Sequence, residues 1–329
     1  MTIEMGGNSI KLGIVGAGIM GERLLGAALS QAGDIVHVAG IWDPSAEAMA
    51  RIAAAFPDVP RLSDAAAVVT ASDCLYVASP PASHLGYARM ALAAGKAVFC
   101  EKPLAVDVAD AHAFVAEAGD RGAVNFPFAS SFAVAALQRW IAEGAIGTPQ
   151  RISIEVAFAT WPRSWQRDAA GWLDATAQGG FTREVVSHFL FLSRRLGGPL
   201  SGLKASAEYP EAGRSERRIA ATLNAGDLPV TLTGSVGTTA KDDHNIWMIE
   251  GPAGAVRLRD WSIAERRMAD GSWQPDPEAM PNEKVRPLVL RRQLEGVKAL
   301  VRGEPFHLAT LKEALEVQEI VEAILASRG

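Results

Sequence analysis

Three side chains of this sequence have the chemistry of proton transfer. Lys102 follows a short apolar run, residues 97–100, and so lies just beyond the carboxyl end of an expected strand. Open α/β sheets bind their ligands at that edge. Glu184 and His188 are four residues apart, which places both on one face of a helix, where a carboxylate and an imidazole form an acid/base unit. Taken alone, a solvated lysine and a surface Glu-His pair are the commoner explanations.

A loop with three glycines precedes these residues in the chain. Gly16, Gly18 and Gly21 are spaced G-x-G-x-x-G between an apolar run, residues 11–15, and a helical pattern, residues 22–29. This spacing allows a tight turn, a close approach of the backbone to a pyrophosphate, and close packing of helix on strand. The helix N-terminus adds unpaired N–H groups and the positive end of its dipole. The pattern predicts a dinucleotide-binding loop.

An acidic residue, Asp43, follows the second expected strand, residues 36–42, in the context that supports this interpretation. Its carboxylate accepts hydrogen bonds from an adenosine ribose, whereas a 2′-phosphate would meet its negative charge. No arginine follows Asp43 until Arg51. We therefore expect NAD as the cofactor, with NADP as the alternative. A role for Asp43 as cap of the helix after Pro44 is compatible with this position.

The elements that must position these residues fall into two halves. Short β-like runs alternate with helical patterns in the first half, which predicts βαβ units. The expected strands are 12–15, 36–42, 74–78, 97–100 and a run near 123, with helices such as 46–55 and 84–94. In the second half, strands with period-two alternation are expected at 150–159, 203–209, 217–224, 230–236, 245–250 and 255–259, with helices at 133–143, 181–196, 288–302 and 311–327.

These patterns predict two domains, as the length of 329 residues also does. Residues 1–124 are expected to form an α/β Rossmann domain with a doubly wound parallel sheet. Residues 125–329 are expected to form an α+β domain for substrate binding and oligomerisation, with an open, mostly antiparallel sheet. The C-terminal helix is expected to pack back on the first domain.

Composition excludes several classes of protein. A net charge of −5 argues against a nucleic-acid partner, which needs clustered Lys and Arg. Cys74 and Cys100 are far apart and form no C-x-x-C pair, so neither a disulfide framework nor a metal site is expected. The leading residues have no charged region followed by an apolar stretch, and no apolar run is long enough to span a membrane. We therefore expect a cytoplasmic protein with a loose leader and no membrane partner.

Taken together, the motifs resemble the glucose-fructose oxidoreductase and inositol dehydrogenase family, Gfo/Idh/MocA. The marks are GIVGAGIMG, SPPASH, EKP and a Gly-Gly segment that leads to His188. The resemblance covers nearly the full chain and implies that Lys102 binds the reacting hydroxyl or carbonyl and that Pro103 follows a cis peptide. The cofactor site that it implies consists of Gly16, Gly18, Ile19, Met20, Gly21, Asp43, Ser79, Pro80, His84, Glu101 and Lys102.

The substrate half departs from the family pattern. Glu184 and Phe191 stand where the family usually has aspartates, and a usual arginine is replaced by the segment Asn125 to Phe132. Arg183 has two open interpretations, since its guanidinium can pair with Glu184 or hold a substrate carboxylate. The loop from Trp161 to Arg167 suits a sugar ring and an acidic group, and is equally typical of a packing loop or an interface. The expected substrate residues are Lys102, Arg163, Trp165, Arg183 and His188, with Lys102, His188 and Glu184 as catalytic groups.

The resulting hypothesis is reversible hydride transfer between nicotinamide and a secondary alcohol of a sugar, sugar acid or cyclitol. Two alternatives stay open: a glycoside hydrolase or eliminase that oxidises its substrate transiently, and a non-catalytic dinucleotide-binding regulator. An uncovered sheet face carrying Val230, Leu232 and Ile246 would expose an apolar patch. We therefore expect a homodimer or homotetramer through the second sheet.

Overall fold

The computed structural model describes residues 9–328, except for the side chains of residues 167–169. The expected loose leader, residues 1–8, lies outside the described residues. The chain divides into two compact units: residues 1–130 with 286–315, and residues 131–285 with 316–329. The first unit thus ends at Ser130 rather than at residue 124. It also takes back residues 286–315, which we expected in the second domain.

The first unit is built on sheet A, whose strand order is β14-β5-β4-β3-β1-β2. Its strands are β1 (Ile10–Val15), β2 (Val36–Trp42), β3 (Cys74–Val77), β4 (Ala97–Cys100), β5 (Gly122–Val124) and β14 (Ala309–Thr310). All neighbouring pairs are parallel except β14 with β5. The expected Rossmann-like parallel sheet is confirmed. Its central strands are continuous buried apolar runs, as in sheets covered on both faces.

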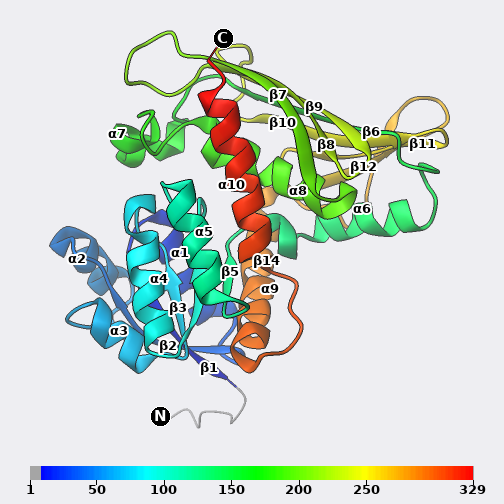
Figure 1. Cartoon of the computed structure of the whole chain (residues 1–329). Coiled ribbons are helices and arrows are strands. Elements are labelled where there is room, and N and C mark those ends of the chain that lie inside the picture. Colours follow the sequence, from blue (N-terminus) through cyan, green and yellow to red (C-terminus); the bar gives the residue numbers. More distant parts are fainter. Residues whose placement is uncertain (1–8, 329) are drawn as a thin grey trace. The chain divides into compact units, whose positions relative to one another are not determined.

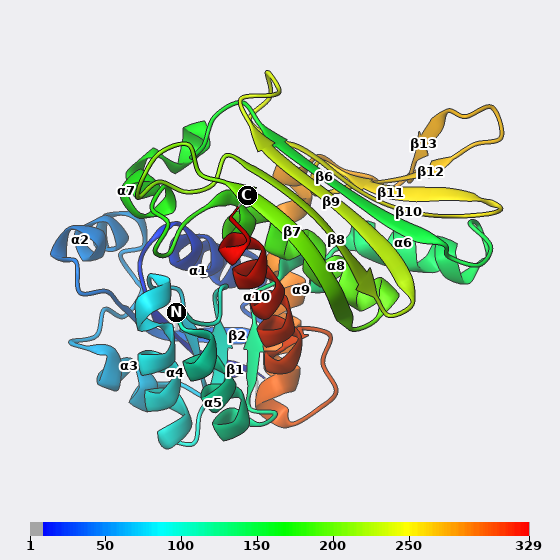
Figure 2. The ribbon, with the colours of Figure 1, turned by 45° about the horizontal axis from the view of Figure 1, so that its top comes forward.

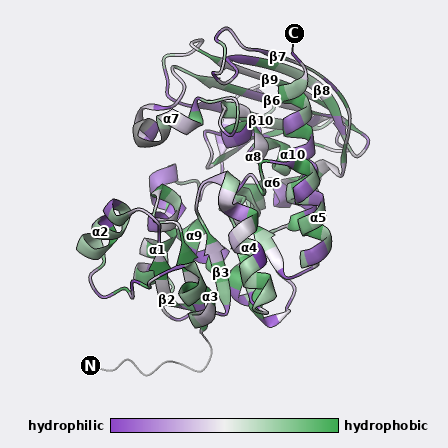
Figure 3. Cartoon of the chain, turned by 60° about the vertical axis from the view of Figure 1, so that its left-hand side comes forward, coloured by the Kyte–Doolittle hydropathy of each residue, from purple (hydrophilic) through white to green (hydrophobic). Residues whose placement is uncertain are grey.

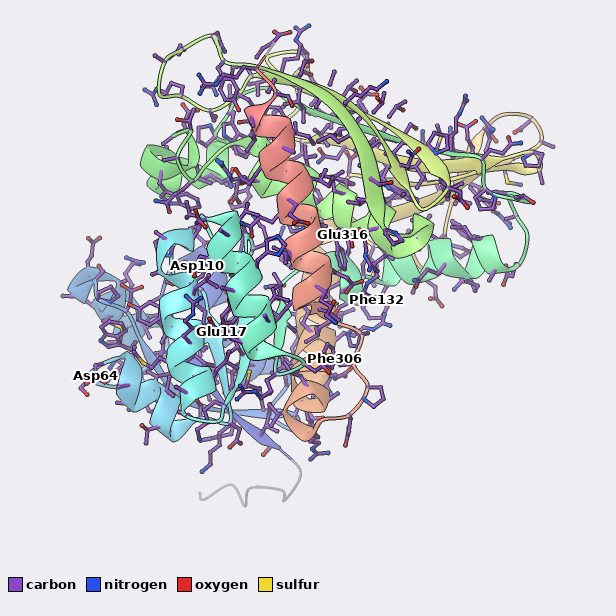
Figure 4. The ribbon with its side chains drawn as sticks, in the orientation of Figure 1. Asp64, Asp110, Glu117, Phe132, Phe306 and Glu316 are labelled. Carbon is purple, nitrogen blue, oxygen red and sulfur yellow. The ribbon has the colours of Figure 1, made fainter. Side chains whose placement is uncertain are left out.

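Helices pack on sheet A and complete its core. They are α1 (Ile19–Gln31), α2 (Ala46–Ala55), α3 (Ala65–Ala71), α4 (His84–Ala93), α5 (Val108–Ala118) and most of α9 (Asn282–Arg302), with 3₁₀ turns at Pro81–Ser83 and Pro127–Ser130. In Figure 3, α4 and α5 carry both hydrophobic and hydrophilic residues, as helices with one buried face do. Arg89 joins them, since it pairs with Asp110 at 2.7 Å and Glu117 at 2.9 Å, both on α5 (Figure 4).

The penultimate helix, rather than the last one, provides most of the chain that returns to the first unit. Leu290, Leu294 and Val297 on α9 lie in one buried cluster with residues of β1 and β2. Their spacing of three and four residues places them on one face of the helix. The last helix, α10 (Leu311–Ala326), contributes to this unit only as far as Leu315, and its remainder belongs to the second unit.

The second unit is built on sheet B, whose strand order is β13-β12-β11-β10-β6-β9-β8-β7. Its strands are β6 (Arg151–Phe158), β7 (Leu200–Glu208), β8 (Arg218–Ala225), β9 (Leu228–Val236), β10 (His244–Gly251), β11 (Gly254–Arg259), β12 (Ile263–Arg267) and β13 (Trp273–Pro275). Only the central pair β6 and β9 is parallel among these neighbours. The expected open, mostly antiparallel sheet is confirmed (Figure 1).

Helices cover one face of sheet B. The helical elements of this unit are α6 (Phe132–Ala142), a 3₁₀ turn (Ser164–Ala169), α7 (Ala170–Leu173), a π turn (Thr182–Val186), α8 (Ser187–Gly197) and the later part of α10. Of these, α6 packs on β11 and β12, and α8 packs on β8. In both views α6 and α8 lie on the same side of the sheet (Figures 1 and 2). Glu316 on α10 (Figure 4) accepts the Leu200 N–H at 2.5 Å and pairs with Arg194 at 3.3 Å, which fixes this helix to α8 and β7.

The opposite face of sheet B differs from the apolar patch that we expected there. Val230 and Leu232 are each 1% exposed and point to the covered face, so the expectation is wrong for these two residues. Strand alternation exposes Thr231 and Thr233 instead, and Ile246 lies on this side of its strand. Oligomerisation through the sheet stays a prediction, with a more polar surface than the sequence suggested.

Within residues 9–328, no helix has the length and the apolar run needed to cross a bilayer. In the same range, no three or more His, Cys, Asp or Glu side chains gather closely enough to hold a metal ion. Cys74 and Cys100 are buried free thiols, and burial raises the pKa of both because a thiolate is poorly solvated there.

Candidate active site

The glycine loop between β1 and α1 has the backbone that its sequence predicts. Gly16 has φ of +105°, and a Cβ there would lie 2.4 Å from the backbone carbon of Ala78. A Cβ at Gly21 would lie 1.9 Å from the Gly16 carbonyl oxygen, so helix and loop touch through main chain. At Gly18, the N-cap of α1, a Cβ would meet no atom within 4 Å. Open space at a helix N-terminus suits an anionic group.

Asp43 is tied to this loop by hydrogen bonds. Its Oδ2 accepts the Ala17 N–H at 2.8 Å, and its Oδ1 accepts the Ser45 N–H at 2.8 Å. The cap of the following helix is a different side chain, Ser45, whose hydroxyl accepts the Ala48 N–H at 3.2 Å. Two bonds leave lone pairs on the carboxylate for a ribose hydroxyl. Arg51 on α2 donates from Nη2 to the Ala17 carbonyl oxygen of the glycine loop at 3.4 Å.

His84 holds two loops at the carboxyl edge of sheet A. Its Nδ1 lies 2.8 Å from the Pro103 carbonyl oxygen and its Nε2 lies 2.8 Å from the Ser79 carbonyl oxygen. The ring is 1% exposed, so we expect His84 to support the cofactor site through the backbone rather than by direct contact. The peptide between Lys102 and Pro103 is cis, which confirms the expectation for Pro103.

The side chain of Glu101 points into a buried polar network. Its Oε1 accepts hydrogen bonds from Tyr76 Oη and from Asn125 Nδ2, the latter at 2.7 Å. Gln293 on α9 donates in turn to Asn125 Oδ1. Burial, and then the nearby Glu101 charge, raise the pKa of Tyr76. Sequence reasoning missed the network itself: Tyr76 counted only as part of an expected strand and Asn125 only as part of an irregular segment. Only α9 returning to the first unit brings Gln293 here.

In the second unit, the residues before His188 form a π turn rather than a regular α-helix. The Ser187 N–H reaches the Thr182 carbonyl, five residues back. The α-helical spacing expected for Glu184 and His188 therefore does not apply across this segment. Glu184 is half-buried, whereas His188 is 7% exposed and packs edge-on against Trp261, with ring centres 5.5 Å apart.

Arg183 has a structural position rather than either of the two that we considered. Its Nε and Nη2 donate to the two carboxylate oxygens of Glu322 at 2.6 Å each. Its Nη1 donates to the carbonyls of Thr176 and Gly179. All three guanidinium nitrogens thus donate hydrogen bonds within the second unit, so we do not retain Arg183 among the substrate residues.

A buried carboxylate holds the start of the same turn. Glu216 is 1% exposed, and its Oε1 accepts the Thr182 N–H at 2.7 Å and the Thr182 hydroxyl at 2.6 Å. Burial raises the pKa of Glu216 because the charged form is poorly solvated. No motif in the sequence points to this residue.

The aromatic loop is packed by its arginine. Arg163 is 6% exposed, donates to Gln166 Oε1 at 2.9 Å, and pairs with Asp243 at 3.0 Å. Its guanidinium also lies over the rings of Trp161 and Trp165. These contacts favour the packing interpretation for Arg163. The indole of Trp165 is 45% exposed and remains accessible to a ligand.

Comparison with known proteins agrees with this geometry. Residues 10–127 match the model of an oxidoreductase family with an NAD-binding Rossmann fold, Gfo/Idh/MocA. The matched residues lie within the first unit, which therefore carries the NAD-binding domain of that family. The glycine loop fits an NAD cofactor, because the space beside Gly18 is open at the N-terminus of α1.

Several Gfo/Idh/MocA relatives are dehydrogenases. The chain is 26% identical to D-apiose dehydrogenase of Paraburkholderia graminis over 315 residues, which are 89% of this chain and 81% of that protein. It is 36% identical to inositol 2-dehydrogenase of Klebsiella pneumoniae over 149 residues, 43% of this chain and 44% of that protein. The WlbA dehydrogenase from Bordetella pertussis, solved with NADH and UDP-GlcNAcA, shares the fold, with a TM-score of 0.81 at 21% identity over 98% of this chain and 96% of that one.

Proposed function

We propose that this protein is an NAD-dependent dehydrogenase that oxidises a secondary alcohol of a sugar, sugar acid or cyclitol. The observation that carries the proposal is that each unit retains its part of the chemistry. The first has an open glycine loop and places Lys102 just past the carboxyl end of β4. The second buries His188 beside an aromatic wall at the start of α8. The dehydrogenase relatives, named for D-apiose and inositol, support a polyhydroxylated substrate.

The position of Asp43 supports NAD over NADP. Its carboxylate is anchored by two backbone N–H groups, so it is held at the end of β2 rather than free to turn away. A 2′-phosphate would meet this fixed negative charge, whereas two ribose hydroxyls would donate to it. Arg51 on α2, which reaches the Ala17 carbonyl of the glycine loop, is the residue through which NADP would be accommodated.

The roles of Lys102 and His188 follow from the chemistry of the alcohol. Bound nicotinamide supplies the acceptor for the hydride. The carbon releases hydride only as its hydroxyl loses a proton, so a base must lie within hydrogen-bond reach of that oxygen. We assign this base to His188, which takes the proton. We assign to Lys102 the binding of the same oxygen and the stabilisation of the charge that develops on it.

Specificity is assigned to fewer residues than the sequence suggested. Arg163 and Arg183 are occupied by Asp243 and Glu322, so neither is proposed to bind a substrate carboxylate. Trp165 remains, because an exposed indole stacks well on the apolar face of a sugar ring. Glu184, half-buried on the π turn, stays a proposed catalytic group.

The test is nicotinamide absorbance with NAD or NADP and a panel containing myo-inositol, D-apiose, other sugars and sugar acids. We expect Lys102→Ala and His188→Ala each to lower kcat by about 100-fold or more. Lys204→Ala and His37→Ala change exposed residues of the same types and should leave kcat unchanged.

Other outcomes would identify the alternatives. Cleavage of a glycoside without net change in nicotinamide absorbance would identify the transient-oxidation hydrolase. Cofactor binding with no turnover of any panel member, equal in wild type and both variants, would favour the non-catalytic regulator.

A further inference from the structure

The turn between β11 and β12 has an unfavourable backbone. Asp260 has φ of 46° and Trp261 has φ of 75°, and among residues 9–328 no other non-glycine residue has a positive φ. This left-handed region suits glycine or asparagine, and a bulky aromatic residue there is a true outlier. Asp260 Oδ1 is also buried without a hydrogen-bond donor in the described part of the chain. The turn therefore has both an unfavourable backbone conformation and a buried oxygen without a donor. Backbone strain of this kind often marks a functional position.

Neighbouring contacts hold the turn in this conformation. The Asp260 N–H donates to the Asn245 carbonyl at 3.0 Å, and the Ser262 hydroxyl donates to the Met280 carbonyl at 3.0 Å. Arg259 pairs with Asp260 at 3.2 Å. The turn is thus fixed on both sides of Trp261.

The indole is directed at the start of α8. Its ring centre lies 5.5 Å from that of His188, with the planes at 78°, and 5.4 Å from that of Phe189, with the planes at 41°. An edge-on arrangement at this distance is a favourable aromatic contact. The indole therefore covers one side of the imidazole. Phe189 is fully buried and holds the other end of the contact in place.

We propose that Trp261 is a positioning residue for His188, and this inference rests on the proposed function. The strained turn places the indole against the imidazole and limits it to the orientation in which it accepts the substrate proton. Simple packing explains the contact less well, because the unstrained choices at a positive φ are small residues and the chain has a tryptophan there.

The first arm of the test is kinetic and uses the panel member that the wild type turns over. Trp261→Ala should lower kcat about 100-fold, since small displacements of a catalytic group have effects of that size. NAD affinity and the KM for NAD should not change. Trp261→Phe, which retains an aromatic ring, should recover most of the loss. Met268→Ala changes an exposed residue just after β12 and leaves the turn and the indole intact, so kcat should stay within about twofold of wild type.

The second arm needs no substrate. The ring protons of labelled histidine are observed by NMR in the free protein, and His188 is assigned from the signal missing in His188→Ala. In Trp261→Ala the NOEs from the His188 ring protons to neighbouring side chains should change, beyond the shift that loss of the indole ring current causes by itself. In Met268→Ala these NOEs should match the wild type. Wild-type kcat in a folded Trp261→Ala protein, or an unchanged pattern of NOEs from the His188 ring, would overturn the proposal. If His188→Ala is itself fully active, the proposed function fails, while the NMR result still decides whether Trp261 orients this ring.

Discussion

The two units hold their functional groups by different means. In the first unit the cofactor loop depends on backbone contact, since a Cβ at Gly21 would lie 1.9 Å from the carbonyl oxygen of Gly16. In the second unit the segment before His188 is held by side chains from distant positions, such as Arg183 with Glu322. Only glycine fits at such a backbone contact, because a Cβ would clash. A side-chain pair can instead be made by many combinations of residues. The cofactor loop is therefore specified by a short sequence motif, whereas the residues that hold the segment before His188 come from distant parts of the chain.

The largest effect on stability is expected from the side-chain pair. Arg183→Ala leaves Glu322 without its partner and two carbonyls without a donor, in a site where Arg183 is 11% exposed. We expect a loss of about 3 kcal/mol in the free energy of unfolding, measured with urea. Arg218→Ala is the control, because Arg218 is 61% exposed and its contact with Glu208 is long, at 3.8 Å. Equal losses in the free energy of unfolding for Arg183→Ala and Arg218→Ala would show that the buried pair does not hold the segment before His188.

Next in size is the effect of a methyl group in the glycine loop. Gly21→Ala should cost about 1–3 kcal/mol, because the Cβ strikes backbone that has little freedom to move. Gly18→Ala should leave stability nearly unchanged, since its Cβ meets no atom, but should weaken NAD binding measured by calorimetry. Gly86→Ala, in open space on α4, is the control that should change neither property for the worse. Full NAD affinity in Gly18→Ala would contradict the assigned position of the pyrophosphate.

A smaller, pH-dependent effect is expected at Glu216. Burial raises its pKa in the folded protein above the ordinary 4.5. The folded state therefore binds the proton more tightly, so the stabilisation is complete below pH 4.5 and is lost as the pH rises through the folded-state pKa. Glu216→Gln keeps an acceptor for Thr182 and should remove this part of the pH dependence. Urea unfolding across that pH range tests it, and an unchanged slope in the variant would exclude Glu216 as its source.

The smallest effect on stability is expected at Trp165. The indole is 45% exposed, so Trp165→Ala should change the free energy of unfolding by less than about 1 kcal/mol. If the ring stacks on a sugar, the KM for substrate should rise while kcat stays close to wild type. A change in kcat alone would instead indicate that the loop acts on the chemistry and not on binding.

Much of the first unit was predictable from local sequence. Its strands, the glycine loop and the helix over Ala46–Ala55 follow from patterns a few residues long. Six of the eight strands of the second sheet were also expected, because period-two alternation marks them, whereas β12 and β13 were missed. The face of the sheet on which each side chain lies was harder to predict, and Val230 and Leu232 were assigned to the wrong face. Which face of an alternating strand is covered depends on where the helices pack.

The pairs that shape the candidate site were not predictable in the same way. Arg163 with Asp243 and Arg183 with Glu322 join positions 80 and 139 residues apart. From the sequence, each arginine was equally suited to a substrate carboxylate, because charge and fork geometry are the same for either partner. Only the fold shows that an internal carboxylate already occupies each one.

By itself, the sequence determined the dinucleotide loop and the alternation of strands and helices, because these depend on residues close together in the chain. It also placed Lys102 and His188 within their motifs. The tertiary structure decided that α9 completes the first unit, that a π turn precedes His188, and that Trp261 lies against its ring. These features arise from contacts between residues far apart in sequence. Such contacts depend on the packed arrangement of whole elements, which no local pattern records.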